Sequence, residues 1–139
     1  MATKIKHIVI NKDVCTGCRY CEIICSLTHE KIVNPKSSRI RVFYDTINGV
    51  KNPIVCQQCT DPACLKACKP VAITMDLRLG IPKVNPRKCV GCGSCIKACP
   101  SKAIFLDPQK SIAIKCDLCG GDPQCVKFCM QHAINAIVS

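Results

Sequence analysis

The stretch Cys89-Val-Gly-Cys-Gly-Ser-Cys-Ile-Lys-Ala-Cys-Pro100 decides the fold of this 139-residue chain. Three cysteines follow one another with two residues between them, a fourth comes after three more residues, and a proline closes the run. This spacing lets three thiolates on one tight loop hold three corners of an iron–sulfur cube, while the fourth cysteine leaves the loop for a second cube. One such stretch therefore predicts a partner stretch elsewhere in the chain.

The sixteen cysteines fall into four groups that repeat this pattern. Each group keeps two residues between its first two cysteines and three between its last two, while the middle gap is two, four, two and five residues long. The groups are Cys15, Cys18, Cys21 and Cys25; Cys56, Cys59, Cys64 and Cys68; Cys89, Cys92, Cys95 and Cys99; and Cys116, Cys119, Cys125 and Cys129. Such regular spacing indicates an internal repeat.

The composition leaves little for an ordinary hydrophobic core, with three Phe, two Tyr and no Trp. Cysteine at this density indicates disulfides, zinc sites or iron–sulfur clusters. The apolar run at 8–10 is too short for a signal peptide or a membrane span, so we expect a soluble, cytoplasmic protein. Thiols stay reduced in that compartment, which disfavours disulfides.

Zinc is the alternative that the paired cysteines leave open. Zinc sites use two pairs separated by a spacer of ~12 to 20 residues, and they do not need a third cysteine close by. The first and third groups supply that third cysteine at the spacing of an iron–sulfur loop. The pattern therefore predicts four [4Fe-4S] clusters whose iron is held by all sixteen cysteines, with a zinc-structured binding scaffold as the second hypothesis.

The formal charge of +11 invites a nucleic-acid interpretation. The charge falls to about +3 if four clusters each add about −2. Lys and Arg are also spread along the chain, without a long run and without interleaved aromatic residues. We therefore expect no nucleic-acid partner. No paired carboxylates, Ser, His and Asp arrangement or phosphate loop is visible, so we expect a non-catalytic protein.

Short runs rich in Ile and Val surround the cysteine groups. We expect strands at 5–10, 54–55, 71–75, 82–84, 103–106, 112–114 and 134–138, and a short helix carrying the last two cysteines of each group. The pair Ala-Ile follows the last cysteine of three groups at one offset, and we expect it to shield the clusters. These pairs are Ala72-Ile73, Ala103-Ile104 and Ala133-Ile134.

The segment 26–55 interrupts the repeat between the first two groups. A turn at Asn48-Gly49 predicts a hairpin over 40–55, which could serve as a docking arm or as a structural lid. Three histidines, His7, His29 and His132, lie outside cluster-ligand spacing, so we expect surface or hydrogen-bonding roles for them.

The order of the four groups resembles the iron–sulfur electron-transfer subunits of molybdenum and tungsten oxidoreductases. The stretches Cys15-Thr-Gly-Cys-Arg-Tyr-Cys-Glu-Ile-Ile-Cys-Ser-Leu-Thr-His-Glu30 and Ser38-Arg-Ile-Arg-Val42 are similar to a narrower set. That set comprises the small iron–sulfur subunits of aldehyde:ferredoxin oxidoreductase-type complexes, including class II benzoyl-CoA reductases. Unlike the family pattern, a proline follows the fourth cysteine only as Pro100, a departure that affects a turn and no ligand.

The resemblance implies an α+β fold of two pseudo-symmetric bacterial 2[4Fe-4S] ferredoxin-like modules, interleaved in sequence within one domain spanning 1–139. Module A combines 1–30 with 107–139, module B spans 50–106, and 26–55 connects them. The first and fourth groups then exchange their last cysteines, and so do the second and third. The implied ligand sets are set 1 (Cys15, Cys18, Cys21, Cys129), set 2 (Cys116, Cys119, Cys125, Cys25), set 3 (Cys56, Cys59, Cys64, Cys99) and set 4 (Cys89, Cys92, Cys95, Cys68).

Spacing alone leaves open a pairing of the first group with the second and of the third with the fourth. The resemblance also implies partners: a catalytic tungsten or molybdenum pterin subunit, a soluble ferredoxin or a flavin- or NAD-linked subunit, and possible stacking with further copies of the chain. A free-standing polyferredoxin, or an electron carrier for carbon monoxide dehydrogenase or hydrogenase, is the alternative function.

Overall fold

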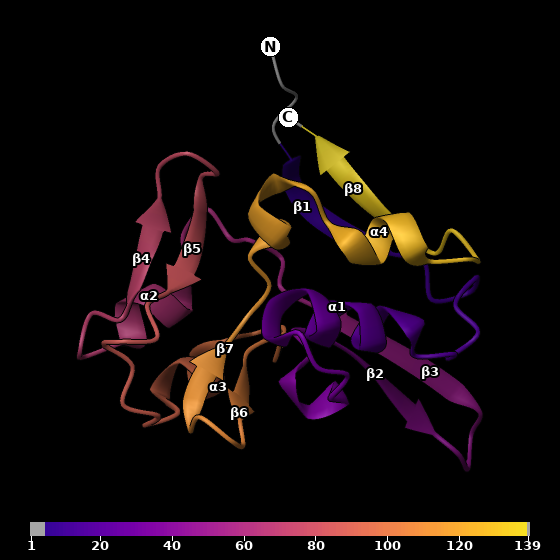
Figure 1. Cartoon of the computed structure of the whole chain (residues 1–139), viewed down its shortest axis with the longest axis horizontal. Helices are drawn as coiled ribbons and strands as arrows, with labels where there is room; N and C mark the ends of the chain where they lie inside the picture. The colour runs from indigo at the N-terminus through magenta and orange to yellow at the C-terminus, as the bar shows by residue number, and fades with distance from the viewer. Residues whose placement is uncertain (1–4, 139) are drawn as a thin grey trace.

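The computed structural model describes residues 5–138, where short strands and helices alternate along the chain (Figure 1). The strands are β1 (Ile5–Ile10), β2 (Ile40–Asp45), β3 (Val50–Val55), β4 (Ile73–Asp76), β5 (Ile81–Val84), β6 (Phe105–Asp107), β7 (Ile112–Ile114) and β8 (Ile134–Val138). The helices are α1 (Tyr20–Glu30), α2 (Ala63–Ala67), α3 (Ser94–Ala98) and α4 (Gln124–Phe128), with 3-10 turns η1 (Pro35–Ser37) and η2 (Leu118–Gly121). The protein is a small ferredoxin-like α+β fold, as expected.

The strands form four separate antiparallel pairs within residues 5–138. Three pairs are hairpins between neighbours in sequence, β2–β3, β4–β5 and β6–β7, whereas β1 pairs with β8 from the far end of the chain. In that pair Ile5 lies opposite Val138 and Ile10 opposite Ile134. The first and fourth cysteine groups are thereby held side by side, because β1 leads into one group and β8 follows the other.

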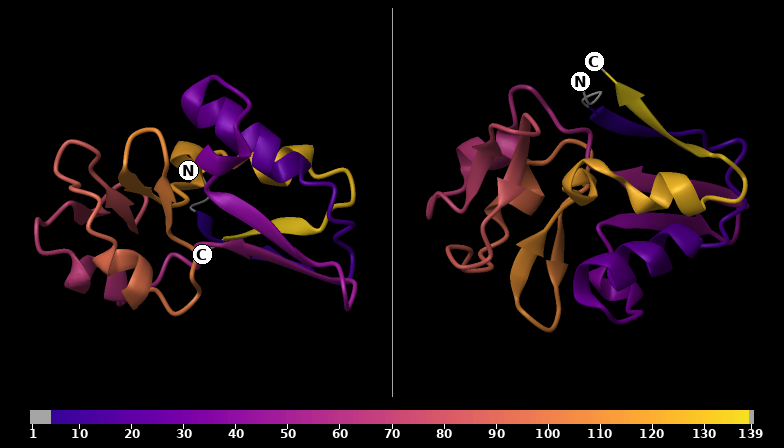
Figure 2. Two further views of the ribbon diagram at one scale, coloured as in Figure 1. Left: turned by 90° about the horizontal axis from the view of Figure 1, so that it is seen from below. Right: turned by 45° about the horizontal axis from the view of Figure 1, so that its top comes forward.

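The helices also pair across the sequence. Helix α1 packs against α4, and α2 packs against α3. The figures show α2 and α3 on one side of the molecule with β4 and β5, while α1, α4, β1, β2, β3 and β8 lie on the other (Figures 1 and 2). One side therefore carries the second and third cysteine groups, and the other carries the first and fourth.

The hairpin predicted over 40–55 is confirmed, with Asp45 opposite Val50 and a left-handed Gly49 in its turn. The expected strands 71–75 and 103–106 begin later, at Ile73 and Phe105. The reason is backbone geometry: Val71 and Lys102 are left-handed, with φ values of 56° and 55°, and the alanines after them, Ala72 and Ala103, donate their N–H groups to cysteine sulfurs and not to a neighbouring strand.

The first group departs from the expected short helix. Helix α1 has eleven residues and carries both Cys21 and Cys25. Helices α2, α3 and α4 are short, with five residues each, but they carry only the third cysteine of their groups, and the fourth is the residue directly after the helix. Helix α1 continues until Lys31, whose left-handed backbone donates an N–H to the Leu27 carbonyl.

The core consists of isoleucines mixed with cysteines. Ile8, Ile73, Ile104 and Leu118 are almost completely buried. They share one continuous cluster with buried cysteines from all four groups, namely Cys25, Cys56, Cys64, Cys95, Cys99, Cys116 and Cys125. Thiols thus occupy positions that aliphatic side chains fill in ordinary domains. Along residues 5–138, no helix has the length and apolar character needed to cross a bilayer.

Candidate metal centres

All four cysteine loops contain the same backbone turn. The residue two positions after the first cysteine is left-handed in every loop, with φ values of 75° at Gly17, 49° at Gln58, 74° at Gly91 and 57° at Leu118. Glycine adopts this conformation without cost, whereas Gln58 and Leu118 are strained by about 1 kcal/mol or more. In those two loops the turn points the residue's N–H at the sulfur of the first cysteine, over 3.4 Å in each case.

A second recurrent turn follows the last cysteine of three groups. Val71, Lys102 and His132 are left-handed, and each donates its N–H to the carbonyl of the cysteine three residues before it, over 3.1–3.2 Å. The next residue is the alanine of the Ala-Ile pair. Ala72 donates its N–H to the Cys68 sulfur over 3.2 Å, and Ala103 donates to Cys99 over 3.5 Å.

These contacts give the Ala-Ile pair a role that the sequence reasoning missed. The side chains are buried, as expected of residues that shield a site. In addition, in two of the three pairs the alanine N–H donates to a cysteine sulfur, which favours the thiolate. The repeated offset was the available signal, since a backbone donor depends on position rather than on side-chain type.

The first group obtains the same hydrogen bond from a different source. Because α1 runs on past Cys25, no left-handed turn follows this cysteine, and the N–H of Arg39 reaches its sulfur instead, over 3.2 Å. Burial alone would raise the pKa of Cys25, but hydrogen bonds from His29 and Arg39 outweigh it and lower the pKa below the usual value. The segment 26–55 thus completes the surroundings of a cysteine.

The cysteines of sets 1 and 4 line two small cavities. Cys15, Cys18, Cys21 and Cys129 surround one, together with Tyr20, Val42 and Pro53 among other residues. Cys68, Cys89, Cys92 and Cys95 surround the other, together with Pro70, Ile73 and Val84 among others. In both cavities three cysteines come from one loop and the fourth comes from another group.

The cysteines of sets 2 and 3 are close enough to influence one another's charge. Burial, and then the thiols of Cys116, Cys119 and Cys25, raise the pKa of Cys125. In the same way burial, and then Cys56 and Cys99, raise the pKa of Cys64, while Lys115 opposes this rise. Buried, clustered thiols stay protonated unless a cation binds them, so these surroundings suit a metal centre.

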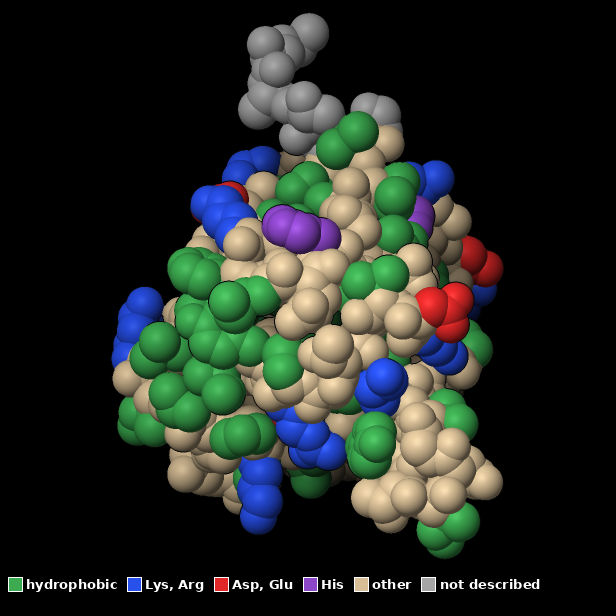
Figure 3. Space-filling model, turned by 90° about the vertical axis from the view of Figure 1, so that its right-hand side faces the viewer, with side chains coloured by type: hydrophobic (Ala, Val, Ile, Leu, Met, Phe, Trp, Pro, Cys, Tyr) green, Lys and Arg blue, Asp and Glu red, His purple; other side chains and the backbone are tan. Residues whose placement is uncertain are grey.

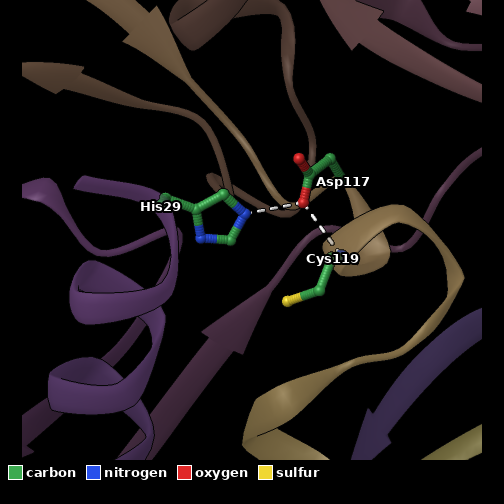
Figure 4. Close-up of side chains that lie close together, drawn as sticks. All are labelled: His29, Asp117 and Cys119. Atoms are coloured by element: carbon green, nitrogen blue, oxygen red, sulfur yellow. Dashed lines mark hydrogen bonds and ion pairs between the residues drawn. The ribbon is translucent and has the colours of Figure 1, made fainter. Parts of the chain in front are cut away.

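His29 joins the first and fourth groups through a hydrogen-bond network (Figure 4). Its Nε2 lies 2.8 Å from Asp117 Oδ1, and its Nδ1 lies 2.8 Å from the Cys25 carbonyl oxygen and 3.8 Å from the Cys25 sulfur. Asp117 Oδ1 also accepts the N–H of Cys119 over 2.9 Å. This is the hydrogen-bonding role expected for His29.

The charges of this network are mutually stabilising. Burial works against a charged imidazole, but the hydrogen bonds to Asp117 and Cys25 raise the pKa of His29 to about 9. Burial likewise opposes the charge on Asp117, whose hydrogen bond with His29 lowers its pKa to about 2. His29, Asp117 and Cys119 offer ligand atoms close enough together for a small metal site, yet Cys119 is one of the predicted iron ligands. The His29–Asp117 pair therefore orients the loop that carries Cys119, through the hydrogen bond from the Cys119 N–H to Asp117.

Comparison with known proteins assigns this arrangement to a family. The 4Fe-4S dicluster domain matches residues 48–138. The polyferredoxin-like subunit of the aliphatic sulfonate oxidoreductase of Pyrococcus furiosus is 44% identical over 130 residues, which cover 94% of this chain and 75% of that subunit. The chain belongs to the 4Fe-4S dicluster family.

Other members of the 4Fe-4S dicluster family and a solved structure agree with this. The electron transport protein HydN of Escherichia coli K12 is 30% identical over 152 residues, covering 93% of this chain and 86% of HydN. A chain of the active site complex BamBC of benzoyl coenzyme A reductase superposes with a TM-score of 0.58 at 31% identity, covering 95% of this chain and 75% of that one. The resemblance inferred from the cysteine groups is confirmed.

The residues present fit a 4Fe-4S dicluster protein. All sixteen cysteines are free thiols, so disulfides do not consume them. Soft sulfur donors on tight loops, with backbone N–H groups directed at several of the sulfurs, are what an iron–sulfur cluster requires. Family membership decides for iron–sulfur and against the zinc hypothesis.

Proposed function

We propose that this chain is an electron-transfer subunit that holds four [4Fe-4S] clusters in sets 1 to 4 and relays electrons between a catalytic tungsten or molybdenum pterin subunit and a second redox protein. The observation that supports the proposal is a pair of cavities lined by the cysteines of sets 1 and 4, each with three cysteines from one loop and one from another group. When bound, each cluster supplies one reversible one-electron step.

The crossed pairing of groups is part of this proposal. The packing of α1 against α4 and of α2 against α3 supports it, because each fourth cysteine lies in or directly after a helix that packs against the helix carrying the third cysteine of the set that it would complete. This crossed pairing corresponds to two modules, one built from 1–30 with 107–139 and the other from 50–106.

Exposure suggests the order of the sets. Cys18 in set 1 and Cys92 in set 4 are exposed, whereas the other fourteen cysteines are buried or half-buried. The packing of α1 against α4 and of α2 against α3 supports a position of set 1 beside set 2 and of set 3 beside set 4. The Gln58 side chain, in the set 3 loop, donates to the Cys116 carbonyl of set 2 over 2.9 Å, which supports a position of set 2 beside set 3. We infer a linear order in which sets 1 and 4 face the redox partners.

Apolar residues around the exposed cysteines suit protein contacts. Tyr20, Phe128 and Met130 are exposed beside set 1, and Val71 and Val90 are exposed beside set 4. Hydrophobic side chains also form a continuous group bordered by Lys and Arg on one face of the molecule (Figure 3). Apolar contacts bordered by charge are typical of interaction surfaces.

Anaerobic purification tests the cofactor content. We expect a brown protein that absorbs broadly, is bleached by dithionite and contains about sixteen iron atoms and as much acid-labile sulfide per chain. About eight iron atoms would show that only two of the sets are loaded. Colourless protein with stoichiometric zinc would contradict the electron-transfer role.

Copurification tests the partner. A tagged chain isolated anaerobically from native cells should bring down a larger subunit that contains tungsten or molybdenum. The polyferredoxin-like subunit of Pyrococcus furiosus and the chain of the BamBC complex motivate this expectation. Isolation of the chain alone would favour a free-standing electron carrier, and a ladder of sizes would indicate stacked copies.

A further inference from the structure

Lys115 is buried at the boundary between sets 2 and 3, the two inner sets of the inferred order. Its side chain is 4% exposed, and within residues 5–138 no other lysine is buried. It lies between β7 and Cys116 of set 2. Its ammonium group donates to the Gln58 side-chain oxygen over 3.1 Å, and Gln58 stands between Cys56 and Cys59 of set 3. One cation therefore touches the loops of both sets.

The other acceptors of Lys115 are backbone carbonyls. The ammonium group donates to the Cys116 carbonyl over 3.0 Å and to the carbonyl of Pro82 in β5. The Gln58 amide closes the network by donating to the same Cys116 carbonyl over 2.9 Å. Three segments, the second-group loop, β5 and the fourth-group loop, are thus tied to one nitrogen atom.

None of these acceptors carries a negative charge. The ion pairs found in residues 5–138 include Lys66, Lys83, Lys110 and Lys127, but not Lys115. Burying an ammonium group without an anion is unfavourable, and hydrogen bonds to neutral oxygens offset only part of that cost. The fold therefore requires negative charge near Lys115 from another source.

The two neighbouring cysteine sets are the available source. A [4Fe-4S] cluster with four thiolates carries a charge of about −2 in its oxidised form and gains a further negative charge on reduction. A fixed cation between two such centres stabilises their reduced forms more than their oxidised forms. Exposed lysines act far more weakly, because solvent and salt screen them.

We propose that Lys115 is the counter-charge of the clusters in sets 2 and 3, raising the reduction potentials of these two centres above the values they would have without it. The inference rests on the proposed function, since it needs the clusters to be present. Lys115 is proposed to act only through its positive charge, which changes the reduction potentials of the neighbouring clusters. Its effect falls on the middle of the inferred electron path.

The test is an anaerobic redox titration of the holoprotein followed by electron paramagnetic resonance. Lys115→Gln removes the charge but keeps an amide donor. We expect it to weaken reduction of two of the four centres about tenfold, which is about 59 mV toward more negative potential for a one-electron couple, while the other two stay unchanged. Lys115→Arg keeps the charge and should retain the wild-type potentials, and exposed Lys36→Gln serves as the matched control.

A second variant covers the case in which Lys115→Gln does not retain iron. Gln58→Glu leaves Lys115 in place and puts a carboxylate where its amide acceptor stood, so the local charge is cancelled. The same two centres should shift to more negative potential. The electrostatic role would be overturned by unchanged potentials in iron-replete Lys115→Gln or Gln58→Glu protein, or by an equal shift in Lys36→Gln. Loss of iron from both Lys115→Gln and Gln58→Glu would overturn it as well. Wild-type protein without iron would instead refute the proposed function.

Discussion

Two glycines in the third cysteine loop, Gly91 and Gly93, share a left-handed backbone but differ in their surroundings. A Cβ on Gly91 would lie 2.1 Å from the Ser111 carbonyl oxygen, whereas a Cβ on Gly93 would meet no atom within 4 Å. Gly91 therefore allows both a tight turn and a close approach of the loop to the turn before β7. Gly93 is needed for the turn alone.

The matched variants Gly91→Ala and Gly93→Ala separate these two needs. Gly93→Ala should cost about 1–2 kcal/mol in the free energy of unfolding, from the left-handed backbone alone. Gly91→Ala should cost at least about 2 kcal/mol more, because a backbone carbonyl must move. Anaerobic denaturant unfolding measures both, and equal losses would contradict the close approach seen at Gly91.

Gln58 and Leu118 occupy the position that Gly17 and Gly91 have in the loops of sets 1 and 4. Both are left-handed and buried, and both lie in the loops of the inner sets. Gln58 bonds to Lys115, and Leu118 is completely enclosed in the core. Packing and hydrogen bonds thus offset the backbone strain at these two positions, which is the usual condition for such strain to persist.

Helix α1 carries the cysteine that best distinguishes the possible pairings of groups. Cys25 lies inside α1, which packs against α4, and its thiol influences the pKa of Cys125. If Cys25 belongs to set 2, Cys25→Ser and Cys119→Ser should change the same cluster signal in electron paramagnetic resonance. Cys18→Ser should change a different one. A common signal for Cys25→Ser and Cys18→Ser would refute the exchange between groups one and four.

The hairpin β2–β3 has a buried base and an exposed tip. Val42 is 3% exposed and lines the set 1 cavity together with Pro53, and its N–H donates to the buried Glu22 carboxylate over 3.0 Å. Val50 near the tip is 56% exposed. The base is therefore placed as a lid over set 1, while the tip is free for contacts.

Val42→Ala and Val50→Ala test the lid. Val42→Ala should lower the free energy of unfolding by about 1–3 kcal/mol and speed the bleaching of the protein in air, because it opens space beside set 1. Val50→Ala should stay within about 0.5 kcal/mol of wild type. Equal bleaching rates for both variants and the wild type would argue against a shielding role.

Several elements could be predicted from the sequence because local signals agreed. The runs at 5–10, 112–114 and 134–138 are rich in Ile or in Ile and Val, and all three are strands with those bounds. The turn at Asn48-Gly49 placed the hairpin. The cysteine spacing predicted the loops and the family.

Other features depended on contacts that no local pattern records. The length of α1 follows from its packing on α4, not from the spacing of Cys21 and Cys25, which suits a short helix equally well. The N–H of Arg39 reaches Cys25 from fourteen residues away. Lysine is ordinarily exposed, so nothing in the sequence around Lys115 indicated a buried cation.

The protein as a whole has a core in which thiols replace much of the usual hydrophobic filling. Removing the iron should therefore remove much of the structure. We expect an iron chelator under reducing conditions to abolish the cooperative thermal transition seen by circular dichroism. A zinc-selective chelator at the same concentration should leave the transition unchanged. Persistence of the transition in iron-free protein would mean that the aliphatic core alone maintains the fold.

The antiparallel pairing of β1 with β8 also determines how the chain is connected in space. Ile5 lies opposite Val138, so these two residues from opposite parts of the sequence are neighbours in space. The remaining strands pair as local hairpins. A short bridge between these two ends, with a new opening at the turn around the exposed Leu77, would preserve every strand pair. The fold is therefore suited to circular permutation, and its contacts define the protein independently of where the polypeptide is opened.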